Sequence, residues 1–196
     1  MRRKQSEVTD KIWIQRILSL TNIGRLATVG KDGYPYITPV NFAFYKGNIY
    51  FHCAPKGEKL DNLKQSPQVC FEVDVPLSYL NIDSYPGRPT CQLHQFSHCV
   101  IIRGTASIVI DSSTKVAALN NLITKHEHTT DFEKVTDDIA GFKACKVIEI
   151  VPVSITAKSD LGQKIPEEMR SAIARHFAKR NQVGDAETVE AMGYDF

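Results

Sequence analysis

Residues 24–54, GRLATVGKDGYPYITPVNFAFYKGNIYFHCA, predict three consecutive β-strands. Their apolar runs are rich in Val, Ile, Tyr and Phe, which strands favour. The tripeptide Lys31-Asp32-Gly33 is a hairpin turn signal between the first two strands, and Lys46-Gly47-Asn48 is the next one. Turns this short join antiparallel neighbours, because parallel strands need a long crossover. The stretch therefore indicates the start of an antiparallel sheet.

The rest of the chain adds strands and helices around this core. Further strands are expected at residues 68–75, 99–110 and 145–158, with Gly104 as a bulge or a point of close approach. Helices are expected at residues 8–20, 58–67, 113–127 and 165–180, whereas residues 76–96 have no clear period. In the first helix, Trp13, Ile17 and Leu20 share one face. About six strands in hairpins with peripheral helices predict an α+β fold built on an antiparallel barrel or sheet.

The composition excludes several classes of protein. The chain has 196 residues, of which 42% are hydrophobic and 23% are charged, and its net charge is +2. A charge this small favours neither nucleic acid nor a membrane surface as a partner. The basic start of the chain is not followed by an apolar stretch, so we expect no signal peptide, a cytoplasmic location and five reduced cysteines.

The segment YFHCAPKGEKLDN, residues 50–62, holds the most distinctive chemistry. Lys56, Gly57 and Lys59 stand where a helix begins, and a helix start offers free amides and a favourable dipole to a phosphate. Arg25, at the start of the first strand, is placed to reach the same anion. On the charge pattern alone, a solvated turn explains these lysines better than a phosphate site does.

Thiol catalysis and metal binding fit the sequence less well. His52 and Cys53 are neighbours on a strand and face opposite ways, which argues against a catalytic Cys–His pair. Residues 91–99 hold four candidate zinc ligands, Cys91, His94, His98 and Cys99, but no second pair of ligands follows at the usual spacing. His126 and His128 would point apart on a helix. We therefore predict no metal site.

At the level of motifs, the chain resembles the FMN-binding split β-barrel proteins related to pyridoxamine 5′-phosphate oxidase, and among them the nitroimidazole-resistance (Nim) type. The resemblance rests on GRLATV, the DGYPY turn, PVNF and YFHCAPKGEKLDNL within residues 24–74, supported by CVIIRGTASIV and VIEIVPVSITAKS later in the chain. It covers about residues 9–159. It implies one FMN-binding split-barrel domain, residues 1–196, with a barrel core at about 22–158 and a helical extension at 160–196.

The family pattern implies a set of residues around FMN. Those along the phosphate and ribityl chain would be Arg25, Leu26, Ala27 and Thr28. Those beside the isoalloxazine ring would be Pro39, Val40, Asn41 and Phe42 from the second strand and Phe51, His52, Cys53 and Ala54 from the third. Glu58 and Lys59 would meet the phosphate, and His52 would be the catalytic residue. His98 and Cys99 depart from the Arg and Ser of many relatives, which puts cofactor contacts from that strand in question.

The resemblance further implies a homodimer with FMN at the subunit interface and a flavin-dependent oxidoreductase. The acceptor would be a small planar molecule, nitro-aromatic or similar to vitamin B6. Since the sequence has no GxGxxG fingerprint, we expect the electrons to come from transiently bound NADH or NADPH or from another flavin source. Tyr85, His94 and His98 are candidates to line the acceptor site, with residues 76–96 covering the flavin. The alternatives are a non-catalytic flavin- or haem-binding protein on the same barrel, with His52 or His94 as iron ligand, and an interaction protein with a vestigial pocket.

Overall fold

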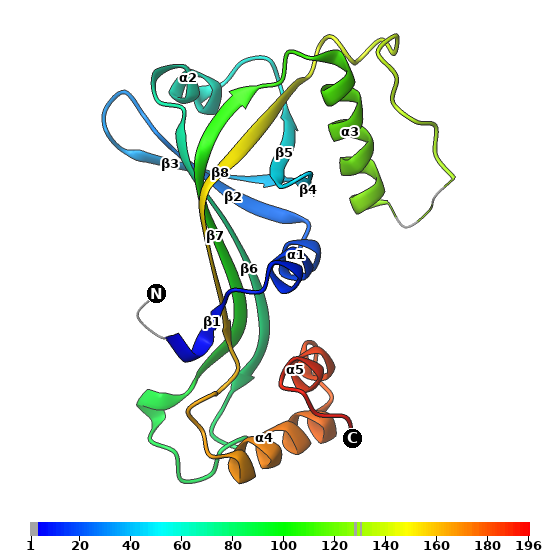
Figure 1. Ribbon diagram of the computed structural model, residues 1–196. Coiled ribbons are helices and arrows are strands. Elements are labelled where there is room, and N and C mark those ends of the chain that lie inside the picture. The colour runs from blue at the N-terminus through cyan, green and yellow to red at the C-terminus, as the bar shows by residue number, and fades with distance from the viewer. Residues whose placement is uncertain (1–3, 128, 130) are drawn as a thin grey trace. The chain divides into compact units, whose positions relative to one another are not determined.

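The computed structural model describes residues 4–127, 129 and 131–196. In this part of the chain, eight strands form one sheet in the order β3-β2-β6-β7-β8-β5-β4, and β1 pairs with β8 (Figure 1). The strands are β1 (Glu7–Val8), β2 (Ile23–Val29), β3 (Pro35–Asn41), β4 (Ala43–Tyr45), β5 (Asn48–Cys53), β6 (Gln68–Leu80), β7 (His94–Ile108) and β8 (Lys146–Asp160). The helices are α1 (Lys11–Ser19), α2 (Glu58–Gln65), α3 (Ser112–His126), α4 (Glu167–Arg180) and α5 (Asp185–Ala191), with short 3-10 turns at Lys4–Ser6 and Thr90–Gln92.

This architecture is the antiparallel split barrel of the α+β class, so the predicted fold class is confirmed. The chain divides into two compact units. The first comprises residues 1–14, 74–99 and 156–196, and the second comprises residues 15–73 and 100–155. β6, β7 and β8 each contribute residues to both units.

The second unit contains the hairpins that the sequence predicts. β2 pairs antiparallel with β3 from Ile23↔Asn41 to Val29↔Pro35, and the Asp32 carboxylate stabilises the connecting turn by accepting from the backbone N–H of Tyr34 at 3.0 Å. The second turn joins β4 to β5. Since β4 is an additional strand of three residues, the stretch forms four strands instead of three.

The strands of the second unit alternate between buried and exposed residues at the β2 side of the sheet. In β2, Leu26 and Thr28 are buried while Arg25 is exposed, as the period of two requires. Phe42, Phe51 and Phe71 are fully buried in this core, and the Phe42 and Phe71 rings meet edge to face at 5.1 Å. Gly104 of β7 is a close-approach point, as expected. A Cβ there would lie 2.5 Å from the carbonyl oxygen of Val151 in β8.

Two sequence predictions about element boundaries are wrong. α1 ends at Ser19, so Leu20 lies outside the apolar face and is 51% exposed. β6 continues to Leu80 and β7 begins at His94, so only residues 81–93 lie between these strands, instead of the expected irregular stretch 76–96. The reason is long-range packing, because Leu77 and Leu80 are buried in a core that the C-terminal part of the chain completes.

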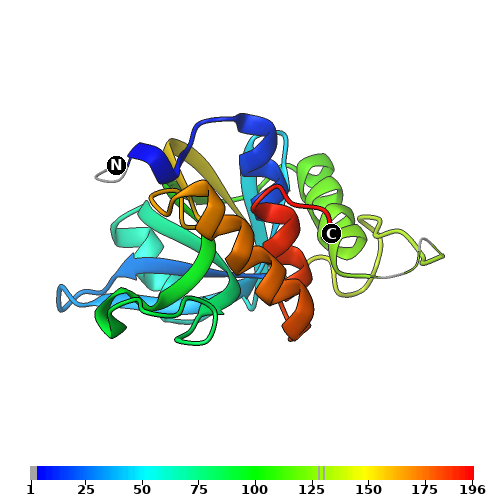
Figure 2. The same ribbon diagram turned by 90° about the horizontal axis from the view of Figure 1, so that it is seen from below.

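That core belongs to the first unit. α4 and α5 lie side by side in Figures 1 and 2 and pack Ile173, Phe177 and Val189 against the end of β6. The sequence predicts α4 at nearly its observed bounds but does not predict α5. Among the described residues, no helix combines the length and apolar character needed to cross a membrane.

Candidate functional site

The residues predicted on β2 and β3 divide between two faces of the sheet. Register places Arg25 beside Pro39 and Ile23 beside Asn41, on the exposed side. Arg25 is not a bare cation, since its Nη1 lies 3.1 Å from Oε2 of Glu72 on β6.

Most of the other predicted residues turn inward, whereas Ala27 shares the side of Arg25 and is half-buried. Leu26, Val40 and Phe42 are buried in the core. Thr28 is buried too, and its hydroxyl accepts a hydrogen bond from Asn62 of α2 at 3.0 Å. Thr28 therefore connects β2 to the helix that carries Lys59.

The end of β5 and the start of α2 bring three predicted residues together. Phe51 and Cys53 are buried, and the ammonium group of Lys59 lies 5.8 Å from the centre of the Phe51 ring. Burial raises the pKa of the Cys53 thiol, and the charge of Lys59 offsets part of that rise. Cys53 is consequently a neutral thiol at pH 7, which suits packing better than nucleophilic attack. Ala54 and Glu58 are exposed at the same turn.

The N-terminus of α2 has features of an anion site. The residue before it, Gly57, has φ +138°, and a Cβ there would meet no atom within 4 Å. No side chain in the described part of the chain caps the helix, so the first amides are available to a ligand. Lys59 and these amides fit a phosphate, whereas Glu58 and Asp61 of the same turn oppose one.

A cavity of about 570 Å³ lies beside α2 and the β2–β3 turn. Glu58 is the one predicted cofactor residue among those described that line it. The cavity is therefore distinct from the cluster of Phe51, Cys53 and Lys59.

His52 points to the opposite face of β5 from Phe51 and Cys53 and is exposed. The structure adds a residue that sequence reasoning missed, because His126, at the end of α3, interacts electrostatically with His52. The amide nitrogen of Asn41 lies 3.3 Å from Nδ1 of His126. Nε2 of His126 is buried and has no hydrogen-bond partner among the described residues. A buried polar atom without a partner is costly, so a polar group of a ligand beside Asn41 would complete this site.

Lys125, next to His126, is the second missed residue. Its ammonium group donates to the Leu18 carbonyl at 3.0 Å, near the end of α1, and lies 3.3 Å from the centre of the Phe42 ring. Burial lowers its pKa to about 8. Burial, together with the charge of Lys125, also lowers the pKa of His126, which keeps this imidazole neutral at pH 7.

We expect Lys125→Met to abolish a pH dependence of stability. Because the folded pKa of about 8 lies below the usual 10.5, the unfolded chain binds the extra proton between these values, and stability rises with pH in that window. The side chain is only half-buried, so solvent screening reduces the gain to about 1–2 kcal/mol. In urea unfolding, the free energy of unfolding of wild type should therefore rise relative to that of Lys125→Met between pH 7.5 and 9.5. The exposed control Lys179→Met should change with pH as wild type does. An equal difference between wild type and Lys125→Met at both pH values would contradict the burial of this charge.

The residues considered as zinc ligands or as the lining of the acceptor site have different surroundings. Tyr85 and His94 line a second cavity, in the first unit. His98 is buried on β7, with its Nδ1 2.8 Å from the Ser159 hydroxyl and its ring edge-on to Trp13. Cys91 is exposed. Among the described residues, no three potential ligands group around a metal position, and His128 lies outside those residues.

Comparison with known proteins places the chain in a family. The family model described as pyridoxamine 5′-phosphate oxidase matches residues 10–159. No curated protein matches. Solved structures that match show the same fold.

Three of these structures illustrate the range. One is a candidate 5-nitroimidazole antibiotic resistance protein from Bacteroides thetaiotaomicron, with 22% identity, TM-score 0.65 and coverage of 78% of this chain and 85% of that one. The flavocytochrome from Azotobacter vinelandii has 18% identity, TM-score 0.70 and coverage of 88% and 77%. The FAD and heme binding protein from Mycobacterium smegmatis has 14% identity, TM-score 0.66 and coverage of 85% and 79%.

The family model spans the β2–β5 hairpins, α2 and the strands that complete the sheet. The family resemblance drawn from the motifs is thereby confirmed, and the chain belongs to the pyridoxamine 5′-phosphate oxidase family.

Proposed function

We propose that this chain is an FMN-binding flavoprotein and a flavin-dependent oxidoreductase that reduces a small planar acceptor, nitro-aromatic or similar to vitamin B6. The observation that carries the proposal is the uncapped start of α2 beside Lys59, in a chain of this family. Structural neighbours described as a flavocytochrome and as an FAD and heme binding protein support a flavin on this fold.

The phosphate would be held by Lys59 and the first amides of α2. Gly57 has no side chain to obstruct the approach, and Lys59 adds a charge-assisted contact. Arg25 would contribute from β2 while it keeps its bond to Glu72. Leu26, Ala27 and Thr28 would follow the ribityl chain through their backbone.

The ring would lie along residues 39–42 and 51–54. Bound FMN supplies hydride or electron transfer to an acceptor stacked on it, which explains why the protein needs no nucleophile of its own. His52 would donate a hydrogen bond to the ring from the exposed end of β5, and Nε2 of His126 would bind a polar atom near Asn41.

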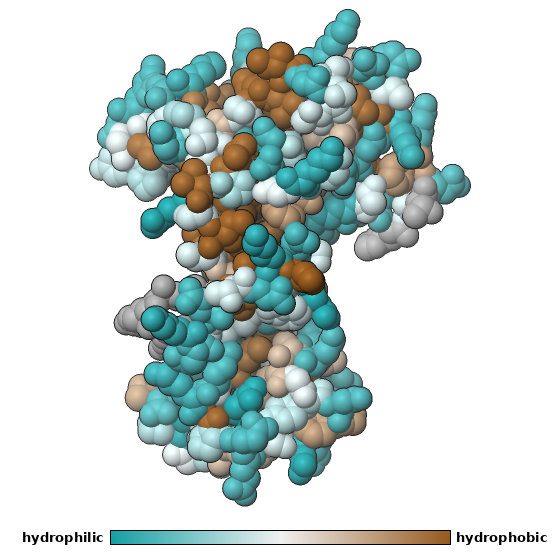
Figure 3. Space-filling view, viewed as in Figure 1, coloured by the Kyte–Doolittle hydropathy of each residue, from teal (hydrophilic) through white to brown (hydrophobic). Residues whose placement is uncertain are grey.

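The exposed side of the sheet supports a homodimer with the cofactor at the interface. In the second unit, large apolar side chains on β2, β3, β7 and β8 remain in solvent, and Figure 3 shows such side chains gathered where Figure 1 labels β2 and β8. They are Ile23 (50% exposed), Val29, Ile37, Ile101, Val151, Val153 (79%) and Ile155. A patch of this kind marks an interaction surface, and a second copy would cover it beside Arg25 and Pro39.

The proposed location is the cytoplasm. All five cysteines are free thiols, and Cys91 is exposed. Free, exposed thiols are typical of a reducing compartment.

Anaerobic mixing of the FMN-loaded protein with NADH or NADPH tests the proposed activity. Bleaching of the flavin bands, followed by their return on addition of a nitro-aromatic compound, is the expected result. Flavin that stays oxidised with both donors would overturn the oxidoreductase and leave a flavin-binding protein.

Haem binding is the second candidate, favoured by the two neighbours named for haem as well as flavin. His94, with Nδ1 on the Gln92 carbonyl, would be the iron ligand through Nε2. A Soret band that disappears in His94→Ala would support this function instead.

A further inference from the structure

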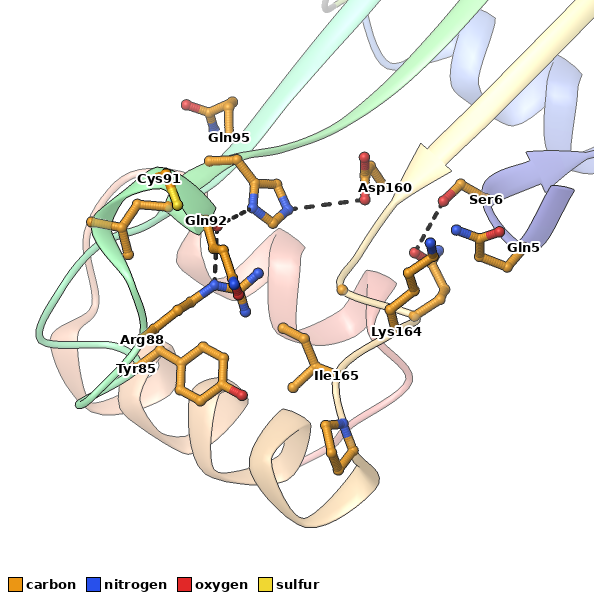
Figure 4. A pocket seen from close by; sticks show the side chains of 15 residues that line it. Gln5, Ser6, Tyr85, Arg88, Cys91, Gln92, Gln95, Asp160, Lys164 and Ile165 are labelled. Carbon is orange, nitrogen blue, oxygen red and sulfur yellow. Dashed lines mark hydrogen bonds and ion pairs between the residues drawn. The ribbon is translucent and has the colours of Figure 1, made fainter. Parts of the chain in front are cut away.

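A cavity of about 530 Å³ lies in the first unit, and none of the residues predicted to bind the cofactor lines it (Figure 4). Its walls come from residues 85–95, which include the start of β7, from residues 160–166 at the end of β8, and from Gln5 and Ser6. The volume falls within the range of roughly 300–1,000 Å³ that is typical of small-molecule sites.

The charges around the cavity do not balance. Asp160 is the one acidic residue among those that line it, and its carboxylate lies 2.6 Å from Nζ of Lys158 and 4.0 Å from Nε2 of His94. Arg88 and Lys164 also line the cavity, and neither has an acidic partner in the part of the chain that the structure describes. The cavity therefore favours an anion.

Two contacts fix the conformation of the Arg88 side chain. Its Nε donates to the Gln92 carbonyl at 3.0 Å, and its guanidinium carbon lies 4.7 Å from the centre of the Tyr85 ring. The same carbonyl accepts from Nδ1 of His94 at 2.9 Å. The terminal amino groups of Arg88 thus remain available at a fixed place, and a planar pair of N–H donors suits a carboxylate or a phosphate.

Part of the wall is apolar, beside polar side chains such as Gln92, Gln95 and Gln163. Figure 4 shows the Tyr85 ring and the Ile165 side chain pointing into the space next to Arg88. Ile165 is 9% exposed and anchored in the core of this unit, so this wall is rigid. A ligand that fills the cavity would place an apolar or ring portion against these two side chains.

We propose that this cavity binds a small organic anion, a carboxylate or phosphate monoester carried on a ring. Arg88 binds the anionic group, Lys164 adds attraction, and Tyr85 and Ile165 contact the ring. The site does not depend on the flavin, so a chain that failed to bind FMN would still bind the anion.

Calorimetric titration of the full chain with benzoate, phenyl phosphate and the neutral analogue benzyl alcohol tests this proposal. We expect at least one of the two anions to bind and benzyl alcohol to bind at least tenfold more weakly. A comparison of the two affinities shows whether the terminal amino groups of Arg88 prefer a carboxylate or a phosphate. Failure of both anions, or equal binding of the neutral analogue, would overturn the proposal.

Variants locate the binding. Arg88→Met should weaken binding of the anion at least tenfold. Arg175 is an exposed arginine of α4 outside the cavity, so Arg175→Met should bind the anion like wild type. Lys164→Met removes a charge without breaking a hydrogen bond in the described structure, and it should also weaken binding of the anion. This variant replaces Arg88→Met in the test if Arg88→Met misfolds. Wild-type affinity in both cavity variants would place the anion elsewhere and refute the site.

Discussion

Asp185→Ala is expected to lower the free energy of unfolding by about 3–5 kcal/mol, the cost of leaving a buried ion pair without one partner. Asp185 is 1% exposed and accepts from Nε and Nη2 of Arg180 at 2.9 and 2.6 Å. It also accepts from the backbone N–H of Gln182 and the hydroxyl of Ser78. Its loss would leave the Arg180 charge without its carboxylate at the junction of α4, α5 and β6.

Urea unfolding measures this effect, with Asp195→Ala as the control. Asp195 is exposed in the same unit, so its removal should change stability by less than about 0.5 kcal/mol. Burial alone would raise the pKa of Asp185, but hydrogen bonds from Arg180, Ser78 and Gln182 lower it below its usual value. This stability is therefore present above the unfolded pKa and lost as pH falls through the folded one. A loss below 1 kcal/mol for Asp185→Ala would contradict the network.

Lys59→Ala should weaken the binding of FMN by about 1.5–3 kcal/mol, the value of a charged hydrogen bond, which is roughly a 10- to 150-fold loss of affinity. The reason is local, because Lys59 is the cation that accompanies the open amides at the start of α2. Titration of the protein with FMN measures the change, and riboflavin, which lacks the phosphate, provides the matched ligand.

Two controls make this test specific. Lys64→Ala removes an exposed lysine from the same helix that is paired with Asp61 at 2.8 Å, and FMN affinity should stay within twofold of wild type. Riboflavin affinity should be the same in wild type and Lys59→Ala. If Lys59→Ala bound FMN as tightly as wild type, the phosphate would lie elsewhere.

Local turn chemistry explains what the sequence could predict of the fold. The Asp32-Gly33 turn and the turn at Gly47 set register through neighbouring residues, and both hairpins occur as expected. β4 was missed because three residues are too short to show a period. α5 was missed because its sequence, DAETVEA, is mostly polar, and its buried residues include Asp185 and Thr188. Both hydrogen-bond Ser78 of β6, more than 100 residues away, which no local pattern could show.

The candidate site likewise combines residues that local motifs predict with residues that only long-range packing brings in. Motifs within residues 24–59 locate the strands and Lys59, because these residues are close in sequence. Lys125 and His126 reach the site only through the packing of α3 against β4 and β5, a long-range contact. Two basic residues at a helix C-terminus are also what the helix dipole favours, so their sequence signal was ambiguous. The anion cavity joins residues 88 and 164, and no local pattern could have paired them.

The visible absorption spectrum of the protein, after incubation with FMN and removal of free flavin by gel filtration, tests the central claim most directly. The account predicts retained flavin bands at one FMN per chain, eluting with the mass of a dimer. A colourless protein that elutes with no flavin would contradict it.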